Sequence, residues 1–154
     1  MPVRGSLAHI DLSISDPDRS IPFYGALLGA LGYQRLRNTG PEFADPNPRR
    51  AVWRIRLESG GSFEIEVRPS SGPNRHRLND RYAPGMHHLA FHVDSAEDVD
   101  CVHRELAAAE ATVLDAPADY TGRRGYSTGY YAAFFADPDG LKIEVAHIPD
   151  ANPT

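Results

Sequence analysis

The sequence predicts an α+β protein made of two βαβββ modules, which form a curled mixed β-sheet cleft with helices on the outside. Two observations predict this fold class. The same order of strand and helix patterns occurs twice along the 154 residues, and matching residues recur at matching spacings in the two halves. We expect one domain over residues 1–154, with module 1 at about 7–68 and module 2 at about 86–148.

The first module begins with a strand and a helix. Residues 7–14 alternate between apolar and polar side chains, which is typical of a half-buried strand. Asp16 is expected to cap a helix in which apolar residues recur at helical spacing until Gly32. A proline-rich loop at 39–50 and a double-glycine turn separate the elements that follow. Three strands are expected there, at residues 33–37, 51–58 and 62–67.

The second module repeats this order after a loop at 68–84. A strand is expected at 87–93, and Ser95 with Asp98 three residues later forms a capping-box pattern for the second helix. The sequence Asp-Pro-Asp-Gly at 137–140 combines residues that favour a tight turn between two strands. The remaining elements are expected to be strands at 112–114, 130–136 and 141–147, with a loop at 115–129.

The repeat includes four residues that could bind a metal ion. His9 and Glu66 lie 57 positions apart in the first module. His88 and Glu144 lie 56 positions apart in the second. Each of the two histidines precedes the cap of its own helix by seven residues, and both glutamates stand in the sequence Ile-Glu-Val. Each module therefore offers a histidine from its first strand and a glutamate from its last strand.

Glu64 is the alternative to Glu66. Both side chains are expected on the same face of one strand, and the spacing of 55 from His9 to Glu64 is as close to 56 as the spacing of 57. The shared Ile-Glu-Val sequence favours Glu66. Both glutamates could also be solvated carboxylates on the exposed face of an antiparallel sheet.

Two imidazoles and two carboxylates suit a divalent metal such as Zn, Ni, Co, Mn or Fe(II). Each of the four is predicted on the polar side of its strand, so curling of the two sheets could bring them to one ion. Because nitrogen and oxygen ligands of this kind leave positions for water or substrate, the set is typical of a catalytic metal.

Residues around this predicted site could shape it. Arg68 begins a basic stretch that runs to Arg81, which suits a carboxylate or phosphate ligand but is also typical of a solvated loop. Residues 120–130 combine tyrosines, arginines and glycines, which suits either a mobile rim over a ligand or an ordinary exposed loop. Strand alternation places His87 on the face opposite to His88, which indicates a packing or surface role.

Four stretches carry a resemblance to a known family: LAHIDLSISD, FYGALLGALGY, GMHHLAFHV and DPDGLKIEV. They are similar to motifs of the vicinal oxygen chelate superfamily, which includes glyoxalase I, methylmalonyl-CoA epimerase, extradiol dioxygenases, and fosfomycin and bleomycin resistance proteins. The resemblance covers residues 7 to about 147. It implies a homodimer and a metal site whose ligands are His9, Glu66, His88 and Glu144.

The leading hypothesis is a metal-dependent, glyoxalase-like lyase or isomerase. Glu144 or Glu66 would remove a proton next to a metal-chelated carbonyl group of the substrate. An Fe(II) extradiol-type dioxygenase acting on a catechol-like substrate would need only His9, His88 and Glu144, so a fourth ligand speaks against it. A metal-free drug-binding or resistance protein would need none of the four.

Composition limits the classes of molecule that we expect the protein to bind. A formal net charge of -5 argues against a nucleic acid partner, and no segment approaches the ~20 apolar residues that a bilayer requires. Cys101 is the single cysteine, which excludes an internal disulfide and a thiolate zinc site and fits the reducing cytoplasm. We expect a small-molecule substrate, which could be anionic, and no membrane partner.

Overall fold

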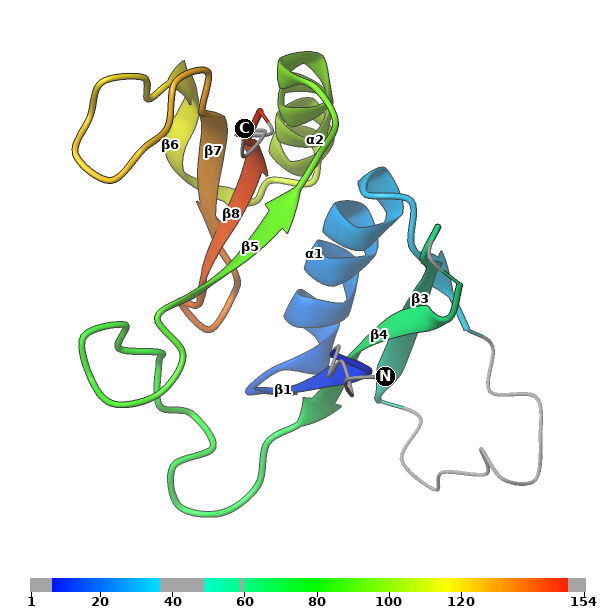
Figure 1. The fold of residues 1–154 in the computed structure, drawn as a ribbon. Coiled ribbons are helices and arrows are strands. Elements are labelled where there is room, and N and C mark those ends of the chain that lie inside the picture. The colour runs from blue at the N-terminus through cyan, green and yellow to red at the C-terminus, as the bar shows by residue number, and fades with distance from the viewer. Residues whose placement is uncertain (1–6, 37–48, 59, 150–154) are drawn as a thin grey trace, which may run out of the picture. The chain divides into compact units, whose positions relative to one another are not determined.

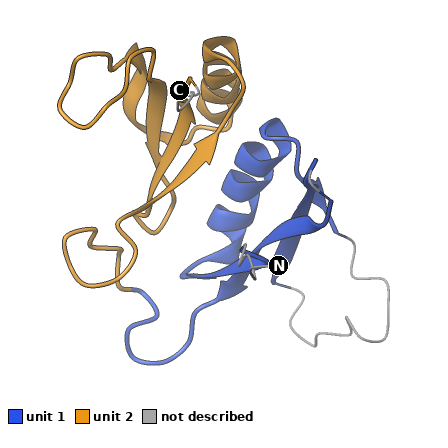
Figure 2. Ribbon diagram, in the orientation of Figure 1, with its two compact units in different colours: residues 1–76 blue, residues 77–154 orange. Residues whose placement is uncertain are grey.

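The computed structural model describes residues 7–36, 49–58 and 60–149. The chain divides into two compact units, Met1–His76 and Arg77–Thr154 (Figure 2). Within the described residues, each unit has one helix and one four-stranded sheet, in the order strand, helix and three strands (Figure 1). The α+β class and the two βαβββ modules are thereby confirmed. The single domain over residues 1–154 stays a prediction.

The sheet of unit 1 has the strand order β1-β4-β3-β2. The first and last strands of the unit, β1 and β4, pair in parallel, and the other neighbours are antiparallel. Of the predicted loop at 39–50 only Arg49 and Arg50 lie within the described residues. The elements of unit 1 are β1 (His9–Ile14), α1 (Pro17–Ala30), β2 (Gln34–Arg35), β3 (Ala51–Arg56) and β4 (Ser62–Pro69).

Helix α1 begins where the sequence predicts. The carboxylate of Asp16 accepts a hydrogen bond of 2.9 Å from the backbone N–H of Asp18, which satisfies a donor that the first turn leaves unpaired. Apolar residues at helical spacing bury one face of α1, and Trp53 and Ile65 are buried on the sheet of the same unit. The core residues contributed by the helix are Phe23, Tyr24, Leu27 and Leu28.

The sheet of unit 2 repeats the connectivity of unit 1, in the order β5-β8-β7-β6. Again the first and last strands pair in parallel and the rest antiparallel. The second strand of the unit runs to Asp119, so the loop predicted at 115–129 was wrong over its first residues. Pairing with the next strand is shifted by bulges, which hide the alternation that would have marked it as a strand. The elements are β5 (His88–His92), α2 (Ala96–Ala108), β6 (Thr112–Asp119), β7 (Tyr131–Ala136) and β8 (Lys142–His147).

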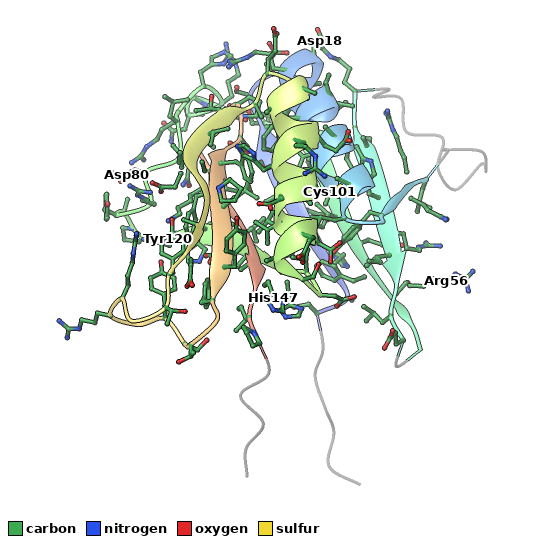
Figure 3. The ribbon with its side chains drawn as sticks, turned by 90° about the horizontal axis from the view of Figure 1, so that it is seen from above. Asp18, Arg56, Asp80, Cys101, Tyr120 and His147 are labelled. Carbon is green, nitrogen blue, oxygen red and sulfur yellow. The ribbon has the colours of Figure 1, made fainter. Side chains whose placement is uncertain are left out.

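Helix α2 carries the predicted capping box. The backbone N–H of Asp98 donates to Ser95 Oγ at 3.2 Å, and Ser95 Oγ donates to the Asp98 carboxylate at 2.7 Å. One face of the helix is buried through Val99, Val102 and Leu106. Cys101 lies on the same helix and is exposed (Figure 3). None of the helices in the described part of the chain has the length and apolar character needed to cross a membrane.

The turn between β7 and β8 is fixed by its side chains. Asp137 Oδ1 accepts hydrogen bonds from the backbone N–H groups of Asp139, at 2.9 Å, and Leu141, at 2.8 Å. Gly140 has a φ of +83°, a conformation that an L side chain adopts at a cost.

Gly140→Ala is therefore expected to lower the free energy of unfolding by about 1–2 kcal/mol in urea denaturation. The matched control is Gly29→Ala in α1, where an added Cβ meets no atom within 4 Å. That variant should be neutral or slightly stabilising, since alanine is the better helix former. Equal losses in both variants would contradict the role of the backbone angle at Gly140.

Candidate functional site

Unit 2 brings His88 and Glu144 together. His88 begins β5, Glu144 lies in the middle of β8, and the two strands are parallel neighbours. The imidazole Nε2 of His88 is 3.3 Å from Oε2 of Glu144. The Glu144 side chain is only 6% exposed, so its carboxylate needs polar partners within the protein.

Tyr130 supplies a second partner for that carboxylate. Its phenolic O–H donates a hydrogen bond to Oε1 of Glu144. Partial burial raises the pKa of the Tyr130 phenol well above its ordinary value, and the bond to Glu144 raises the pKa further. The phenol thus stays protonated as a donor. Its ring packs edge-on against Tyr126, which in turn packs on Tyr120, so this part of the 120–130 loop is a packed aromatic cluster.

His87 contacts the ring of His88, contrary to the prediction that it faces the other way. The Nδ1 atoms of the two imidazoles lie 2.7 Å apart. Strand alternation does not apply to His87, because β5 begins at His88. When Nδ1 of His87 donates to Nδ1 of His88, Nε2 of His88 carries the hydrogen that faces Glu144. When Nδ1 of His88 donates instead, Nε2 has the lone pair that a metal ligand needs. The paired histidines at the strand start were the only sequence signal for this contact.

The strand register identifies the unit 1 equivalent of Glu144. In unit 1 His9 pairs with Glu64 across β1 and β4, and Glu66 lies two residues further along β4. In unit 2 the residue opposite His88 is likewise followed two residues later by Glu144. Glu66, rather than Glu64, therefore occupies the position that corresponds to Glu144. Its role as a ligand stays a prediction.

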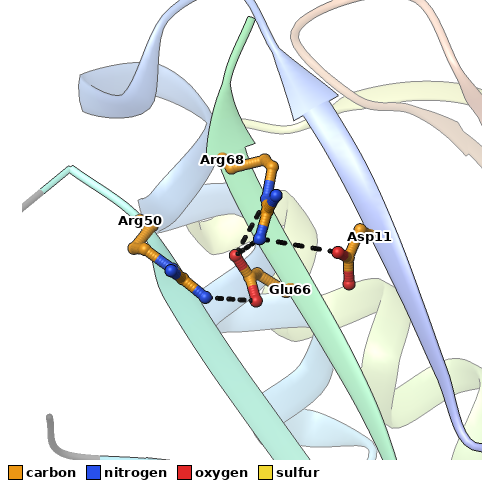
Figure 4. A network of polar contacts seen from close by, with 4 residues as sticks. All are labelled: Asp11, Arg50, Glu66 and Arg68. Carbon is orange, nitrogen blue, oxygen red and sulfur yellow. Dashed lines mark hydrogen bonds and ion pairs between the residues drawn. The ribbon is translucent and has the colours of Figure 1, made fainter. Parts of the chain in front are cut away.

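Glu66 is bound by two arginines (Figure 4). Arg50 Nη2 donates to Oε2 at 2.7 Å, while Arg68 donates to Oε1 from Nε at 3.0 Å and from Nη2 at 2.7 Å. Arg68 Nη2 also lies 3.6 Å from the carboxylate of Asp11. The described part of unit 1 shows no hydrogen bond between His9 and Glu66. Arg50 was missed because it falls in a predicted loop, where spacing carries no information about side-chain contacts.

The two units fit a divalent cation differently. The 3.3 Å between His88 Nε2 and Glu144 Oε2 suits neighbouring ligands of one ion, since bonds of about 2.0–2.2 Å place such atoms roughly 3 Å apart. Both oxygens of Glu66 already accept from guanidinium groups, which would repel a third cation. Among the described residues, no group of three or more His, Cys, Asp or Glu side chains forms a candidate metal site. Glu66 must exchange partners before it can bind a metal.

Comparisons with known proteins agree with this fold. Residues 6–145 match the model of the glyoxalase/bleomycin resistance protein/dioxygenase superfamily. The chain is 30% identical over 139 residues to the uncharacterized protein YqjT of Bacillus subtilis (strain 168), with coverage of 89% of this chain and 94% of YqjT. It is 27% identical over 154 residues to the 2-epi-5-epi-valiolone epimerase of Actinomyces sp, with coverage of 94% and 80%.

A solved structure shows the same architecture. The crystal structure of a glyoxalase/bleomycin resistance protein from Albidiferax ferrireducens T118 aligns with a TM-score of 0.62 and 26% identity. The alignment covers 92% of this chain and 98% of that one. Since the family model matches most of the chain, this protein belongs to the glyoxalase/bleomycin resistance protein/dioxygenase superfamily.

Proposed function

We propose that the protein is a metal-dependent lyase or isomerase that removes a proton from a carbon next to a carbonyl group. The observation that carries the proposal is the His88–Glu144 pair, in which an imidazole nitrogen and a carboxylate oxygen meet at 3.3 Å. A bound divalent metal would polarise the substrate carbonyl and make the adjacent C–H more acidic. The related epimerase of Actinomyces supports this chemistry, because proton removal and return is one route to inverting such a carbon.

Four side chains would hold the ion, which we expect to be Zn, Ni, Co, Mn or Fe(II). They are His9, Glu66, His88 and Glu144. Glu144 is the proposed base, acting after it loosens from the metal, and Glu66 is the second candidate. The hydrogen bond from Tyr130 orients the Glu144 carboxylate, and its low exposure keeps water from competing for the proton. We further propose that the protein is a cytoplasmic homodimer that acts on a small molecule.

Metal analysis followed by an exchange assay tests this function. Protein purified under metal-replete conditions should contain stoichiometric metal, which His9→Ala and His88→Ala should both lose. In D2O, proton NMR should show metal-dependent exchange at the carbon next to the carbonyl for at least one member of a panel of hemithioacetals, epimerisable ketones and acyl-CoA epimers. Oxygen uptake with catechols after Fe(II) loading would instead indicate a dioxygenase. Absence of metal would indicate a binding protein.

His87 gives a prediction about the same pair. His87→Ala removes the hydrogen bond that orients the His88 ring, and loss of such a supporting contact typically weakens metal affinity by about 10–100-fold. Titration of the metal-free protein with Co(II) measures the dissociation constant. His92→Ala is the matched control, since His92 lies on β5 with His88 but contacts the backbone carbonyl of Ile148 instead. Equal weakening in both variants would contradict an orienting role for His87.

A further inference from the structure

The two arginines that bind Glu66 form a site that holds a carboxylate group. Two guanidinium groups, from Arg50 and Arg68, make three hydrogen bonds to one carboxylate whose side chain is 11% exposed. Two guanidinium groups that bind the same carboxylate would repel each other if that anion were absent. Charge-assisted bonds of 2.7–3.0 Å on both oxygens are the way in which proteins recognise carboxylates with arginine.

Strand pairing places the backbones of the two arginines close together. Ala51, the first residue of β3, pairs with Val67, so Arg50 just before β3 lies beside Arg68 on β4. Asp11 on β1, on the other side of β4, lies 3.6 Å from Arg68 and adds a second anchor. We call Arg50 and Arg68 the arginine clamp.

Glu66 has two possible partners that exclude each other. Its register position corresponds to that of Glu144, which makes it the proposed metal ligand of unit 1. Its observed partners are the guanidinium groups of the clamp. A divalent cation that binds Glu66 must draw the carboxylate away from at least part of the clamp, because like charges in contact are costly. Arg50 and Arg68 then lose the carboxylate that they share, while Asp11 stays near Arg68.

We infer that the arginine clamp binds a carboxylate group of the substrate when Glu66 turns to the metal, and that Glu66 fills the clamp when the metal is absent. The inference rests on the proposed function for the metal, and it adds the substrate class: a small carbonyl compound that carries a carboxylate. Metal and carboxylate then help each other to bind, since each removes the competitor of the other, and this coupling is reciprocal.

Calorimetric titration of the metal-free protein with Co(II) tests the coupling. Sodium acetate should tighten Co(II) binding by about fivefold or more relative to sodium chloride of equal ionic strength, a change within the usual range of coupling between sites. Direct chelation of Co(II) by acetate would act in the opposite direction. In Arg50→Gln/Arg68→Gln, Co(II) should bind more tightly than in the wild type without acetate, and acetate should have no further effect.

Arg54→Gln is the matched control. Arg54 lies on β3 and binds Glu64, at 2.7 Å from its Nε, so the variant removes a similar charge from the same face without touching the clamp. It should keep the acetate effect. The inference is overturned if acetate leaves the Co(II) affinity of the wild type unchanged, or if Arg54→Gln abolishes the effect. Inorganic phosphate acting where acetate fails would overturn the assignment to carboxylates.

A metal-free measurement separates this inference from the proposed function. Glu66→Gln removes the internal carboxylate, so saturation-transfer NMR should detect acetate bound to this variant and not to Glu66→Gln/Arg68→Gln. If wild-type protein binds no Co(II) but Glu66→Gln binds acetate, the metal proposal fails while the clamp is retained. If Glu66→Gln binds no acetate, the clamp is refuted whatever the metal result.

Discussion

Replacing Glu144 by glutamine is expected to lower kcat by about 10²–10⁴, the usual contribution of a general base. The amide has nearly the shape of the carboxylate but cannot accept a proton at the reaction's pH, and it is a poor ligand for a divalent cation. The change lies at the carboxylate whose Oε2 lies beside His88 Nε2 and whose Oε1 accepts from the Tyr130 hydroxyl. The rate of solvent deuterium incorporation into the substrate is the direct measurement.

Asp100→Asn provides the control for that substitution. Asp100 also accepts a hydrogen bond from a tyrosine of unit 2, since Tyr131 donates to its carboxylate at 2.9 Å. This variant changes the same kind of contact away from His88, so its kcat should stay within about twofold of the wild type. A Glu144→Gln protein with normal kcat and normal metal content would refute both roles of Glu144. Normal metal with a lost rate would identify it as the base alone.

Trp53→Ala is expected to lower the free energy of unfolding by about 3–5 kcal/mol, the range for deleting a large aromatic side chain from a core. Trp53 is only 2% exposed and lies on β3, where the ring is close to Gly25 of α1. Its loss leaves a cavity between helix and sheet that the backbone can fill only in part. Urea denaturation followed by circular dichroism measures the effect, because the variant removes the only tryptophan that fluorescence would report.

Leu57→Ala is the comparison for the core substitution. Leu57 follows β3 and is 40% exposed, so its removal deletes little buried area. We expect a change of no more than about 0.5 kcal/mol. If Trp53→Ala were equally mild, the packing of α1 on the sheet of unit 1 would be looser than the described contacts indicate.

The fold could be predicted because each element carries a local signal. Alternation marks β1 and β8, helical spacing marks α1 and α2, and the recurrence of one order supplies the topology. The His88–Glu144 pair followed from the same recurrence. The number of positions between His9 and each glutamate could not separate Glu64 from Glu66, because this number also depends on the lengths of the turns and loops between them. The strand ladder removes that ambiguity, since it counts only from paired residues.

The remaining features of the structure could not be predicted, because no periodic pattern in the sequence marks them. Arg50 reaches Glu66 from a segment just before β3, and the length of an arginine side chain allows many end points from one backbone position. His87 stands just outside β5, where the period of two does not yet apply. The length of β6 was hidden by bulges. In each case tertiary pairing, rather than local sequence preference, determined the outcome.

The parallel pairing of the first and last strand in each unit has a consequence for synthesis on the ribosome. Neither sheet can be completed until its final strand has left the exit tunnel, because β1 must wait for β4 and β5 must wait for β8. Contacts this distant along the chain slow folding and leave strand edges uncovered in the nascent protein. The imidazole–carboxylate pair of unit 2 is thus among the last features to appear during synthesis.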